Sequence, residues 1–584
     1  MNGAAGPFGP LLLPDGGTRF RLWAPQARQV ELAVDDTLSP LRPDDDGWYR
    51  CDHAGAGPGT AYRFRIDGEL LVPDPASSFQ PQDVSGPSEV IDHRFAWQAN
   101  EWRGRPWQEA VLYELHVGTF SSEGSFAGAI AHLDHLAAAG ITAIELMPVA
   151  DFSGRRNWGY DGVLLFAPDS AYGRPEDLKR LVDEAHRRGL MVLLDAVYNH
   201  FGPEGNWLPV YAPQFFTDEF HTPWGASVDY RLPAVRDFAV QNALHWLQTY
   251  RFDGLRLDAV HAIRALGQPP LLEILRQAVA ALAAREGRHI HLVVENEDNS
   301  ARLLASGFRA QWNDDYHHAW HVLLTGEAHG YYRDFQQPLP MLRRALSEGF
   351  VYQGERSINR GHARGEDSTK LPPTAFIDFL QNHDQIGNRP FGERLDALAA
   401  PAAVEAALAI TLLAPQIPML FMGEEWGATQ PFPFFCDFHG ALAQAVRDGR
   451  RREFAAHYES HGRHTEPPDA LDSATFESAR LRWSDLADPS AQRRLALVRQ
   501  MLELRRRHVV PRLAGIVQAS VLPGPASLLR VAWRFGDGAV LTLQANLSAQ
   551  LVPVERPGGI CLWGEGAGDA LPPWQVGWFL ATSS

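Results

Sequence analysis

Four short motifs in this sequence each close a run of apolar residues with an acidic side chain. They are Leu194–His200, Gly254–His261, Leu292–Asn296 and Phe379–Asp384. A strand that is apolar along its length and charged only at its last residues is typical of a parallel sheet covered on both faces. In a barrel of such strands, the charged ends open into a site at the carboxyl ends of the strands. The four motifs therefore predict a pocket lined with carboxylates.

Three of these acids are candidates for glycosidase chemistry. Arg256 and Asp258 are two positions apart on one strand, so their side chains point to the same side, and the guanidinium would keep the carboxylate ionised as a nucleophile requires. Glu295 ends the next strand, and we expect the like charges of Asp258 and Asp384 to raise its pKa, as a general acid requires. Nucleophile and acid lie about 5–5.5 Å apart in retaining glycosidases, which neighbouring strand ends allow.

Each acid taken singly could equally be a solvated residue of a loop. Taken together, the four motifs coincide with a repeat of strands and helices, which favours a functional site.

The elements that would position these acids repeat from about residue 108. In the clearest unit Pro175 begins a helix with one apolar stripe, Gly189 ends it, and a buried strand over 190–194 leads to Asp195. The same order of helix, glycine or turn, and buried strand precedes Asp258 and Glu295. Eight candidate strands of this kind predict an α/β fold with a (βα)8 TIM barrel.

Antiparallel β-sandwich domains are predicted on both sides of this barrel. Over residues 1–104 apolar and polar side chains alternate, and the alternation returns over 513–584, where Gly536–Gly538 is a hairpin signal. The barrel would then occupy residues 105–512, with a small insertion at about 200–232.

Composition excludes several other classes of protein. The 70 acidic residues against 53 basic ones give a net charge of −17, which argues against nucleic acid and anionic membranes as partners. The three cysteines, Cys51, Cys436 and Cys561, form no CxxC pair and indicate neither a zinc ribbon nor a disulfide framework. With no visible signal peptide and no uninterrupted apolar span, a cytoplasmic protein is expected.

The four motifs resemble the four sequence regions of the α-amylase superfamily, glycoside hydrolase family 13. Within it, Trp312–His318 and the extension Gln385–Arg389 are similar to the trehalohydrolases that act on maltooligosyl trehalose. The resemblance covers essentially the whole chain, and its first domain would be an immunoglobulin-like, carbohydrate-binding-module-like sandwich. Further stretches that carry it are Tyr113–Phe120, Gly154–Gly162, His200–Asn206, Gln311–His318 and Asn382–Arg389.

The resemblance implies a role for each acid. Asp258 would be the nucleophile, Glu295 the acid/base and Asp384 the stabiliser of the transition state. Arg256, His200 and His383 would line the sugar ring, with Tyr160 stacked against it; packing of Tyr160 beneath a loop is an equal alternative. The other residues expected to bind substrate are Asp161, Leu257, Ala259, Val260, His261, Asn313, Asp314, Asp315, Tyr316, His317, Gln385, Ile386, Gly387 and Asn388. Weaker candidates for stacking are Trp158, Trp207, Trp224 and Trp312.

We expect neither a required metal nor a cofactor. His317, His318 and His321 could suggest a metal site, with His317 and His321 four residues apart. No glutamate completes a zinc motif, so hydrogen bonding near Asp314 and Asp315 is favoured. Asn199 could bind calcium, but the sequence assembles no further oxygen ligands around it.

The leading hypothesis is a retaining hydrolase that cleaves the α-1,4 bond next to the terminal trehalose of maltooligosyl trehalose. Its partners would be that substrate, related α-1,4-glucans and, through its product, a maltooligosyl trehalose synthase. Asn313–His317 and Gln385–Asn388 would recognise the trehalose unit, with Glu204 and Trp207 as weaker candidates. The alternatives are a 1,4-α-glucan branching or debranching enzyme and a non-catalytic glucan-binding protein.

Overall fold

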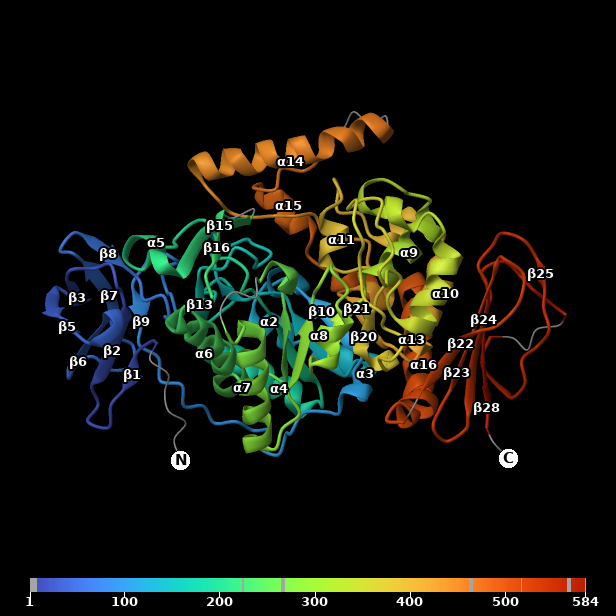
Figure 1. The fold of residues 1–584 in the computed structure, drawn as a ribbon, viewed down its shortest axis with the longest axis horizontal. Coiled ribbons are helices and arrows are strands. Elements are labelled where there is room, and N and C mark those ends of the chain that lie inside the picture. The colour runs from blue at the N-terminus through green and yellow to red at the C-terminus, as the bar shows by residue number, and fades with distance from the viewer. Residues whose placement is uncertain are drawn as a thin grey trace.

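Eight parallel strands close into a barrel at the centre of the computed structural model (Figure 1). The structure describes residues 8–222, 225–263, 268–461, 466–515, 517–564 and 569–582. Around the barrel the strands are β10 (Leu112–Leu115), β11 (Ala143–Leu146), β14 (Met191–Ala196), β17 (Gly254–Leu257), β18 (His291–Val294), β19 (Ala310–Trp312), β20 (Phe376–Asp378) and β21 (Ile417–Phe421). All neighbouring pairs are parallel, and β21 pairs with β10. The predicted (βα)8 barrel is confirmed.

Helices cover the barrel and bury apolar side chains against it, and α4 (Pro175–Arg187) shows the single apolar stripe most clearly. In α4 the stripe is fully buried, and Gly189 follows the helix with a left-handed φ of 73° that a side chain would resist. The other helices of the barrel region are α1 (Val117–Phe120), α2 (Phe126–Ile130), α3 (Leu133–Ala139), α5 (Leu208–Tyr211), α6 (Pro233–Thr249), α7 (Leu271–Glu286), α8 (Ala301–Ala305), α9 (Asp314–Thr325), α10 (Pro338–Glu348), α11 (His383–Gly387), α12 (Leu395–Leu398), α13 (Pro401–Leu413), α14 (Gly440–His461), α15 (Ser473–Ser478) and α16 (Pro489–Leu504).

Two antiparallel sheets form the N-terminal part, at the left of Figure 1. One sheet has the order β1 (Leu11–Leu12), β2 (Thr18–Trp23), β6 (Trp48–His53), β5 (Arg42–Pro43). The other has the order β4 (Thr37–Pro40), β3 (Val30–Val34), β7 (Ala61–Ile66), β8 (Leu70–Val72), with β9 (Ser88–Glu89) also on β7. Burial alternates along β3, as the sequence pattern predicts for a sheet with one face in the core.

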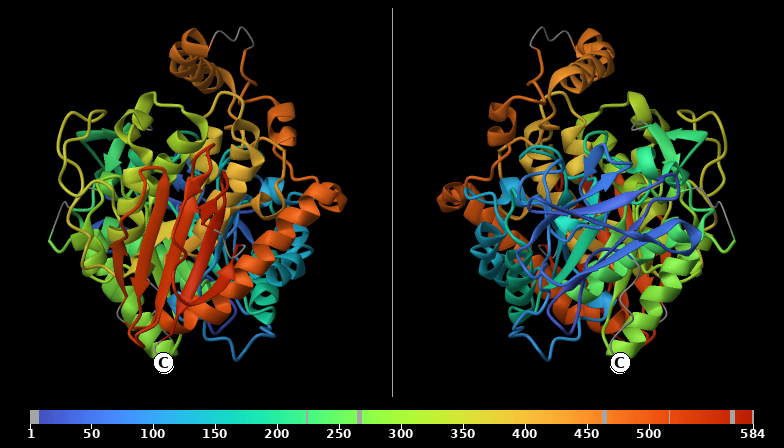
Figure 2. Two further views of the ribbon diagram at one scale, coloured as in Figure 1. Left: turned by 90° about the vertical axis from the view of Figure 1, so that its right-hand side faces the viewer. Right: turned by 90° about the vertical axis from the view of Figure 1, so that its left-hand side faces the viewer.

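A five-stranded antiparallel sheet forms the C-terminal part, at the opposite end of the molecule (Figures 1 and 2). Its order is β22 (Gln518–Val521), β23 (Leu528–Arg534), β24 (Val540–Asn546), β28 (Val576–Ala581), β26 (Ile560–Trp563), and β25 (Val552–Pro553) pairs with β27 (Ala570–Leu571) beside it. The indole N–H groups of Trp533 and Trp578 donate to the carbonyls of Leu346 and Ala409, both at 3.2 Å. These bonds join the sheet to α10 and α13. The domain boundaries given above stay predictions.

Two short antiparallel pairs of strands lie in the connections between barrel strands. β12 (Ala150–Asp151) pairs with β13 (Leu164–Pro168), and β15 (Phe216–Thr222) pairs with β16 (Gly225–Val228) inside the stretch predicted as an insertion.

Gly254 controls how closely two of the site-bearing strands approach. It faces His291 across the β17–β18 pair, and a Cβ atom at Gly254 would lie 2.4 Å from the His291 carbonyl oxygen. We expect Gly254→Ala to cost about 1–3 kcal/mol by overpacking and to move Asp258 relative to Glu295. The thermal unfolding midpoint and turnover should therefore both fall.

Gly449→Ala on α14 is the matched control, because a Cβ atom there would have no other atom within 4 Å. Its midpoint should equal or exceed that of the wild type, since alanine favours a helix. A Gly254→Ala protein with wild-type midpoint and turnover would contradict this account of strand spacing.

Candidate active site

The carboxyl ends of the barrel strands open into one cavity of about 840 Å³. Asp258 directly follows β17, Glu295 directly follows β18, and Asp384 belongs to α11 beyond β20. All three line the cavity. Asp384 therefore lies on a short helix and not at a strand end as predicted, because Asn382 caps that helix through the Asp384 amide at 2.9 Å.

Arg256 is the electrostatic centre of the cavity floor. It is 2% exposed, and its Nη1 donates to both oxygens of Asp195 at 2.7 Å and to Asp258 Oδ1 at 2.8 Å. Its Nη2 lies 3.8 Å from Glu295 Oε2. The predicted contact between Arg256 and Asp258 is present. Trp312 lies beneath the guanidinium, 4.1 Å from ring centre to Cζ, and is 2% exposed, so its ring supports Arg256.

Asp258 is held by a second donor besides Arg256. The side-chain amide of Asn199 donates to Asp258 Oδ2 at 2.7 Å. Both carboxylate oxygens thus accept a hydrogen bond, which fixes the orientation of this group. Asn199, considered above as a calcium ligand, is engaged with the carboxylate.

A left-handed backbone at Ala259 aims an amide at Glu295. Ala259 has a φ of 42°, a backbone conformation that residues other than glycine seldom adopt. Its N–H donates to Glu295 Oε2 at 2.6 Å. The next amide, that of Val260, donates to the Glu295 carbonyl at 3.0 Å. The turn after β17 therefore positions the acid at the end of β18, at the cost of local backbone strain.

The pKa of Glu295 is raised well above its ordinary value. Burial is the main cause, and the negative charges of Asp258 and Asp314 add to it against the opposing charge of Arg256. The predicted direction is thus found, but burial leads and Asp314 takes the place we had given to Asp384. A carboxylic acid kept protonated in this way can donate a proton.

Asp384 lies in the cavity wall, surrounded by protein yet open to the water in the cavity. Burial raises its pKa, and the positive charges of His383 and Arg256 oppose the rise. Burial works to lower the pKa of His383, but the negative charge and hydrogen bond of Glu114 outweigh it and raise that pKa. His383 Nδ1 lies 2.5 Å from Glu114 Oε1, so a buried pair supports the segment that carries Asp384.

Tyr160 forms a flat aromatic wall beside these acids. Its ring stacks against His383 with centroids 5.1 Å apart, and its hydroxyl donates to Asp195 Oδ2 at 2.5 Å. His200 Nε2 lies 2.7 Å from the Tyr160 carbonyl oxygen. The Tyr160 ring lines the cavity, while its hydroxyl and carbonyl groups are hydrogen-bonded to Asp195 and His200. A packed tyrosine can therefore still offer its ring to a sugar.

Half of the residues predicted to bind substrate line this cavity. Besides the three acids they are Tyr160, Asp161, His200, Arg256, Ala259, His261, Asp314, His383 and Asn388, and the candidate platforms Trp158 and Trp312 line it as well.

The other predicted residues lie behind the cavity wall or beside it, outside the lining. They are Leu257, Val260, Asn313, Asp315, Tyr316, His317, Gln385, Ile386 and Gly387, and all of them are buried. Glu204 and Trp207 are also outside the lining, and Trp224 lies outside the described residues.

Two of these residues, Asp315 and His317, make buried hydrogen bonds that hold the cavity wall together. Asp315 is fully buried and accepts from Arg364 Nη1 at 2.6 Å and from the Asn299 amide at 2.8 Å. His317 Nδ1 lies 2.6 Å from the Leu380 carbonyl oxygen and its Nε2 lies 3.1 Å from the Tyr332 hydroxyl. Its hydrogen bonds are thus made to these groups and not to Asp314 or Asp315. Within the described ranges no cluster of three or more metal-ligating side chains is found.

Sequence reasoning missed the roof of the cavity. The roof consists of Phe434, Phe438 and the α14 residues Leu442, Ala445, Val446, Arg450 and Glu453. Arg450 joins it to the wall, because its Nη2 donates to the Gly387 carbonyl at 3.0 Å and its Nη1 to Asn388 Oδ1 at 3.3 Å. The spacing of Leu442, Val446, Arg450 and Glu453 by three or four residues was the available signal of a helix face, but nothing in it pointed to the strand ends.

Models of known families match three parts of the chain. The alpha amylase catalytic domain matches residues 78–211, and carbohydrate-binding module 48, described as an isoamylase N-terminal domain, matches residues 7–77. A domain of unknown function matches residues 519–578. Among the described helices, none has the length and apolar character needed to cross a bilayer.

The chain is similar to known proteins over nearly its whole length. A malto-oligosyltrehalose trehalohydrolase from Deinococcus radiodurans is 42% identical over 503 residues, covering 85% of this chain and 83% of the relative. One from Rhizobium sp. is 40% identical over 571 residues, covering 93% of each. The crystal structure of a candidate alpha amylase from Salmonella typhimurium has a TM-score of 0.94 and 44% identity, covering 98% of this chain and 99% of that one.

The raised pKa of Glu295 predicts a particular dependence of stability on pH. The unfolded chain ionises this group near its ordinary pKa, whereas the folded protein holds its proton to higher pH, so its contribution to stability is lost as pH rises. Glu295→Gln removes this loss. The difference in thermal unfolding midpoint, variant minus wild type, should therefore be larger at pH 8 than at pH 4.5.

Glu297→Gln makes the same substitution at an exposed residue on the rim of the cavity and is the control. Equal differences from the wild type at both pH values for Glu295→Gln would show that the buried acid is not held protonated.

Proposed function

This chain belongs to the malto-oligosyltrehalose trehalohydrolases, and on that premise we propose that it hydrolyses the α-1,4 bond next to the terminal trehalose of maltooligosyl trehalose. The observation that carries the proposal is the unequal treatment of two neighbouring acids. Asp258 accepts hydrogen bonds on both oxygens from Arg256 and Asn199, while burial raises the pKa of Glu295. One group is prepared to act as a nucleophile and the other as an acid.

The first chemical step follows from these two groups. A carboxylate oxygen of Asp258 attacks the anomeric carbon of the glucose unit at the cleavage point, and the bond from this carbon to the glycosidic oxygen breaks. Glu295 gives its proton to that oxygen, so trehalose leaves as a neutral sugar and the remaining maltooligosaccharide is esterified to Asp258.

In the second step Glu295 acts as a base. It takes a proton from a water molecule whose oxygen attacks the same anomeric carbon, and the ester bond to Asp258 breaks. The shortened maltooligosaccharide is released with its original anomeric configuration, and Glu295 is again protonated.

Three other groups would stabilise the positive charge that develops on the sugar ring. The Asp384 carboxylate faces the cavity, and its negative charge favours an oxocarbenium-like transition state. The Tyr160 ring offers its flat face to the apolar face of the sugar. His383, backed by Glu114, is placed to donate to a sugar hydroxyl.

The trehalose unit would lie beneath the roof formed by α14. Arg450 joins this helix to Gly387 and Asn388, and Asn388 donates to Asp384 Oδ1 at 2.7 Å. The roof is therefore joined to the segment Gln385–Asn388, which the sequence had suggested for trehalose recognition and of which Asn388 lines the cavity. The supply of substrate by a maltooligosyl trehalose synthase remains a proposal from the family resemblance.

Chromatography of the products from maltopentaosyl trehalose tests the reaction. We expect trehalose and maltopentaose in equal amounts from the wild type. Asp258→Asn should lower turnover by at least about 10³-fold, because no covalent intermediate can form. Its unfolding midpoint should stay close to that of the wild type.

Branched or lengthened products would move the assignment to a glucan-transferring enzyme with the same acids. Full turnover by Asp258→Asn would show that another group is the nucleophile. Failure to turn over this substrate and plain or branched glucans would leave a glucan-binding protein.

The role of the roof is tested by Arg450→Ala. Loss of the contacts to Gly387 and Asn388 should loosen the wall, and we expect KM for maltopentaosyl trehalose to rise by on the order of tenfold with kcat nearly unchanged. Arg447→Ala, one turn earlier on α14, is the matched control, because Arg447 pairs with Asp469 and does not line the cavity. Equal KM values for the two variants would refute a role of the roof in binding.

A further inference from the structure

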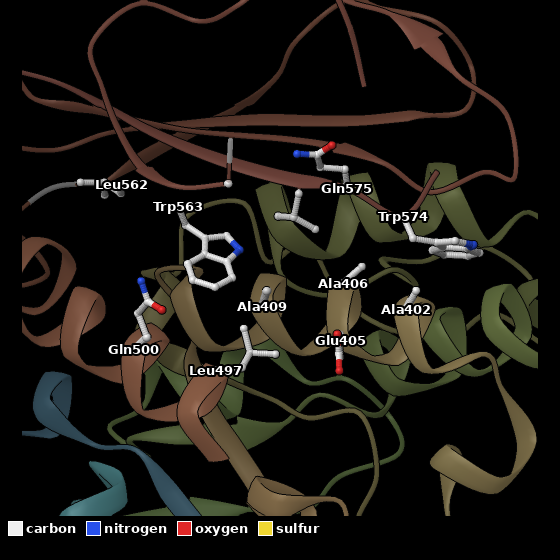
Figure 3. A pocket seen from close by; sticks show the side chains of 12 residues that line it. Ala402, Glu405, Ala406, Ala409, Leu497, Gln500, Leu562, Trp563, Trp574 and Gln575 are labelled. Atoms are coloured by element: carbon white, nitrogen blue, oxygen red, sulfur yellow. The ribbon is translucent and has the colours of Figure 1, made fainter. Parts of the chain in front are cut away.

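A second cavity lies between the barrel helices and the C-terminal sheet (Figure 3). Its volume is about 560 Å³, and it shares no lining residue with the catalytic cavity. α13 and α16 form its floor, and the end of β26 and the turn before β28 form the opposite wall. No part of the mechanism above uses it.

Two tryptophans frame this cavity. Trp563 ends β26, Trp574 precedes β28, and both are only partly buried (Figure 3). Trp574 has a left-handed φ of 56°, an unusual and strained conformation for so large a residue. The turn thus holds an indole at the cavity against a local backbone preference.

Three polar side chains lie around the two indoles. Glu405 from α13, Gln500 from α16 and Gln575 beside Trp574 all line the cavity. In the portion of the chain described here, none of these three side chains has a hydrogen bond or ion pair with protein, and Glu405 and Gln500 are exposed. Between them the floor is made of small residues, Ala402, Ala406 and Ala409, which leave room for a ligand.

We propose that this cavity binds a segment of α-1,4-glucan away from the catalytic centre. A glucose ring has one apolar face of C–H groups, which covers an indole, and a rim of hydroxyls, which need carboxylate and amide partners. Trp563 and Trp574 supply the first, and Glu405, Gln500 and Gln575 supply the second. The choice of α-glucan among sugars rests on the proposed function.

The charge of the cavity favours a neutral sugar over other ligands. Glu405 is the sole charged side chain among the lining residues described, so a phosphate or another anion would be repelled. The two indoles argue against a small ion, because they offer broad apolar faces and few hydrogen bonds. The net charge of −17 likewise disfavours an acidic polymer.

Affinity electrophoresis in gels containing amylose tests the proposal. All proteins carry Asp258→Asn so that the glucan is not degraded. The parent should be retarded, and we expect the apparent Kd for amylose to rise about tenfold for each indole removed in Trp563→Ala, Trp574→Ala and the double variant. Trp97→Ala is the matched control, since Trp97 is also partly buried but packs against Arg251, away from this cavity.

The same substitutions with Asp258 restored should leave kcat/KM for maltopentaosyl trehalose unchanged, because this substrate is short and the two cavities are separate. If the tryptophan variants unfold, Glu405→Ala and Gln500→Ala on exposed helix faces provide the test, with a smaller loss of retardation expected.

Equal retardation of the parent and the double variant would overturn the proposal and place amylose binding in the N-terminal sheets or the catalytic cavity. A parent that is not retarded would overturn it as well. Failure of the proposed function appears separately, as absence of trehalose from maltopentaosyl trehalose, while retardation that depends on the two tryptophans would still support a glucan site here.

Discussion

The catalytic cavity depends on one buried guanidinium. Arg256 carries the positive charge that allows Asp195, Asp258 and Glu295 to share a small volume at the barrel end. Without it, several carboxylates removed from water would repel each other and the region would be strongly destabilised. The Trp312 ring packs against the guanidinium, so a residue of the barrel core helps to position the charge that balances the acids.

This arrangement treats neighbouring acids differently although they are chemically alike. Asp258 accepts hydrogen bonds from Arg256 and Asn199. Glu295 accepts one from the Ala259 amide and lies 3.8 Å from Arg256 Nη2, and burial outweighs both effects on its pKa. Because burial disfavours the ionised form and hydrogen bonding favours it, the same side-chain chemistry yields two roles. Strand geometry supplies the proximity, and burial of Glu295 supplies the difference, against the opposing hydrogen bond from Ala259.

As proposed above, two parts of the molecule away from the barrel strands would enclose or hold the substrate. α14 covers the catalytic cavity and is joined to the wall by Arg450. The cavity beneath the C-terminal sheet would keep a long glucan near the enzyme and raise its local concentration, without taking part in bond cleavage. Figure 1 shows how far apart the N-terminal and C-terminal sheets lie, so a long chain could contact several parts of one molecule.

The sequence by itself determined what depends on local pattern. Apolar periodicity, helix ends and the order of acidic motifs were enough to predict the barrel, its two flanking β parts, the grouping of Asp258, Glu295 and Asp384, and the contact from Arg256 to Asp258. These features follow from the geometry of a strand or a helix and from the rule that parallel strand ends meet.

Tertiary structure decided what depends on approach between distant segments. Packing of α14 over the strand ends added a roof containing Arg450, and the turning inward of Asp315 and His317 made them supports of the wall. Burial was the main cause of the raised pKa of Glu295, and the charges of Asp258 and Asp314 add to it. Desolvation depends on all the atoms that surround a group in the folded protein, and the sequence pattern does not show which atoms these are.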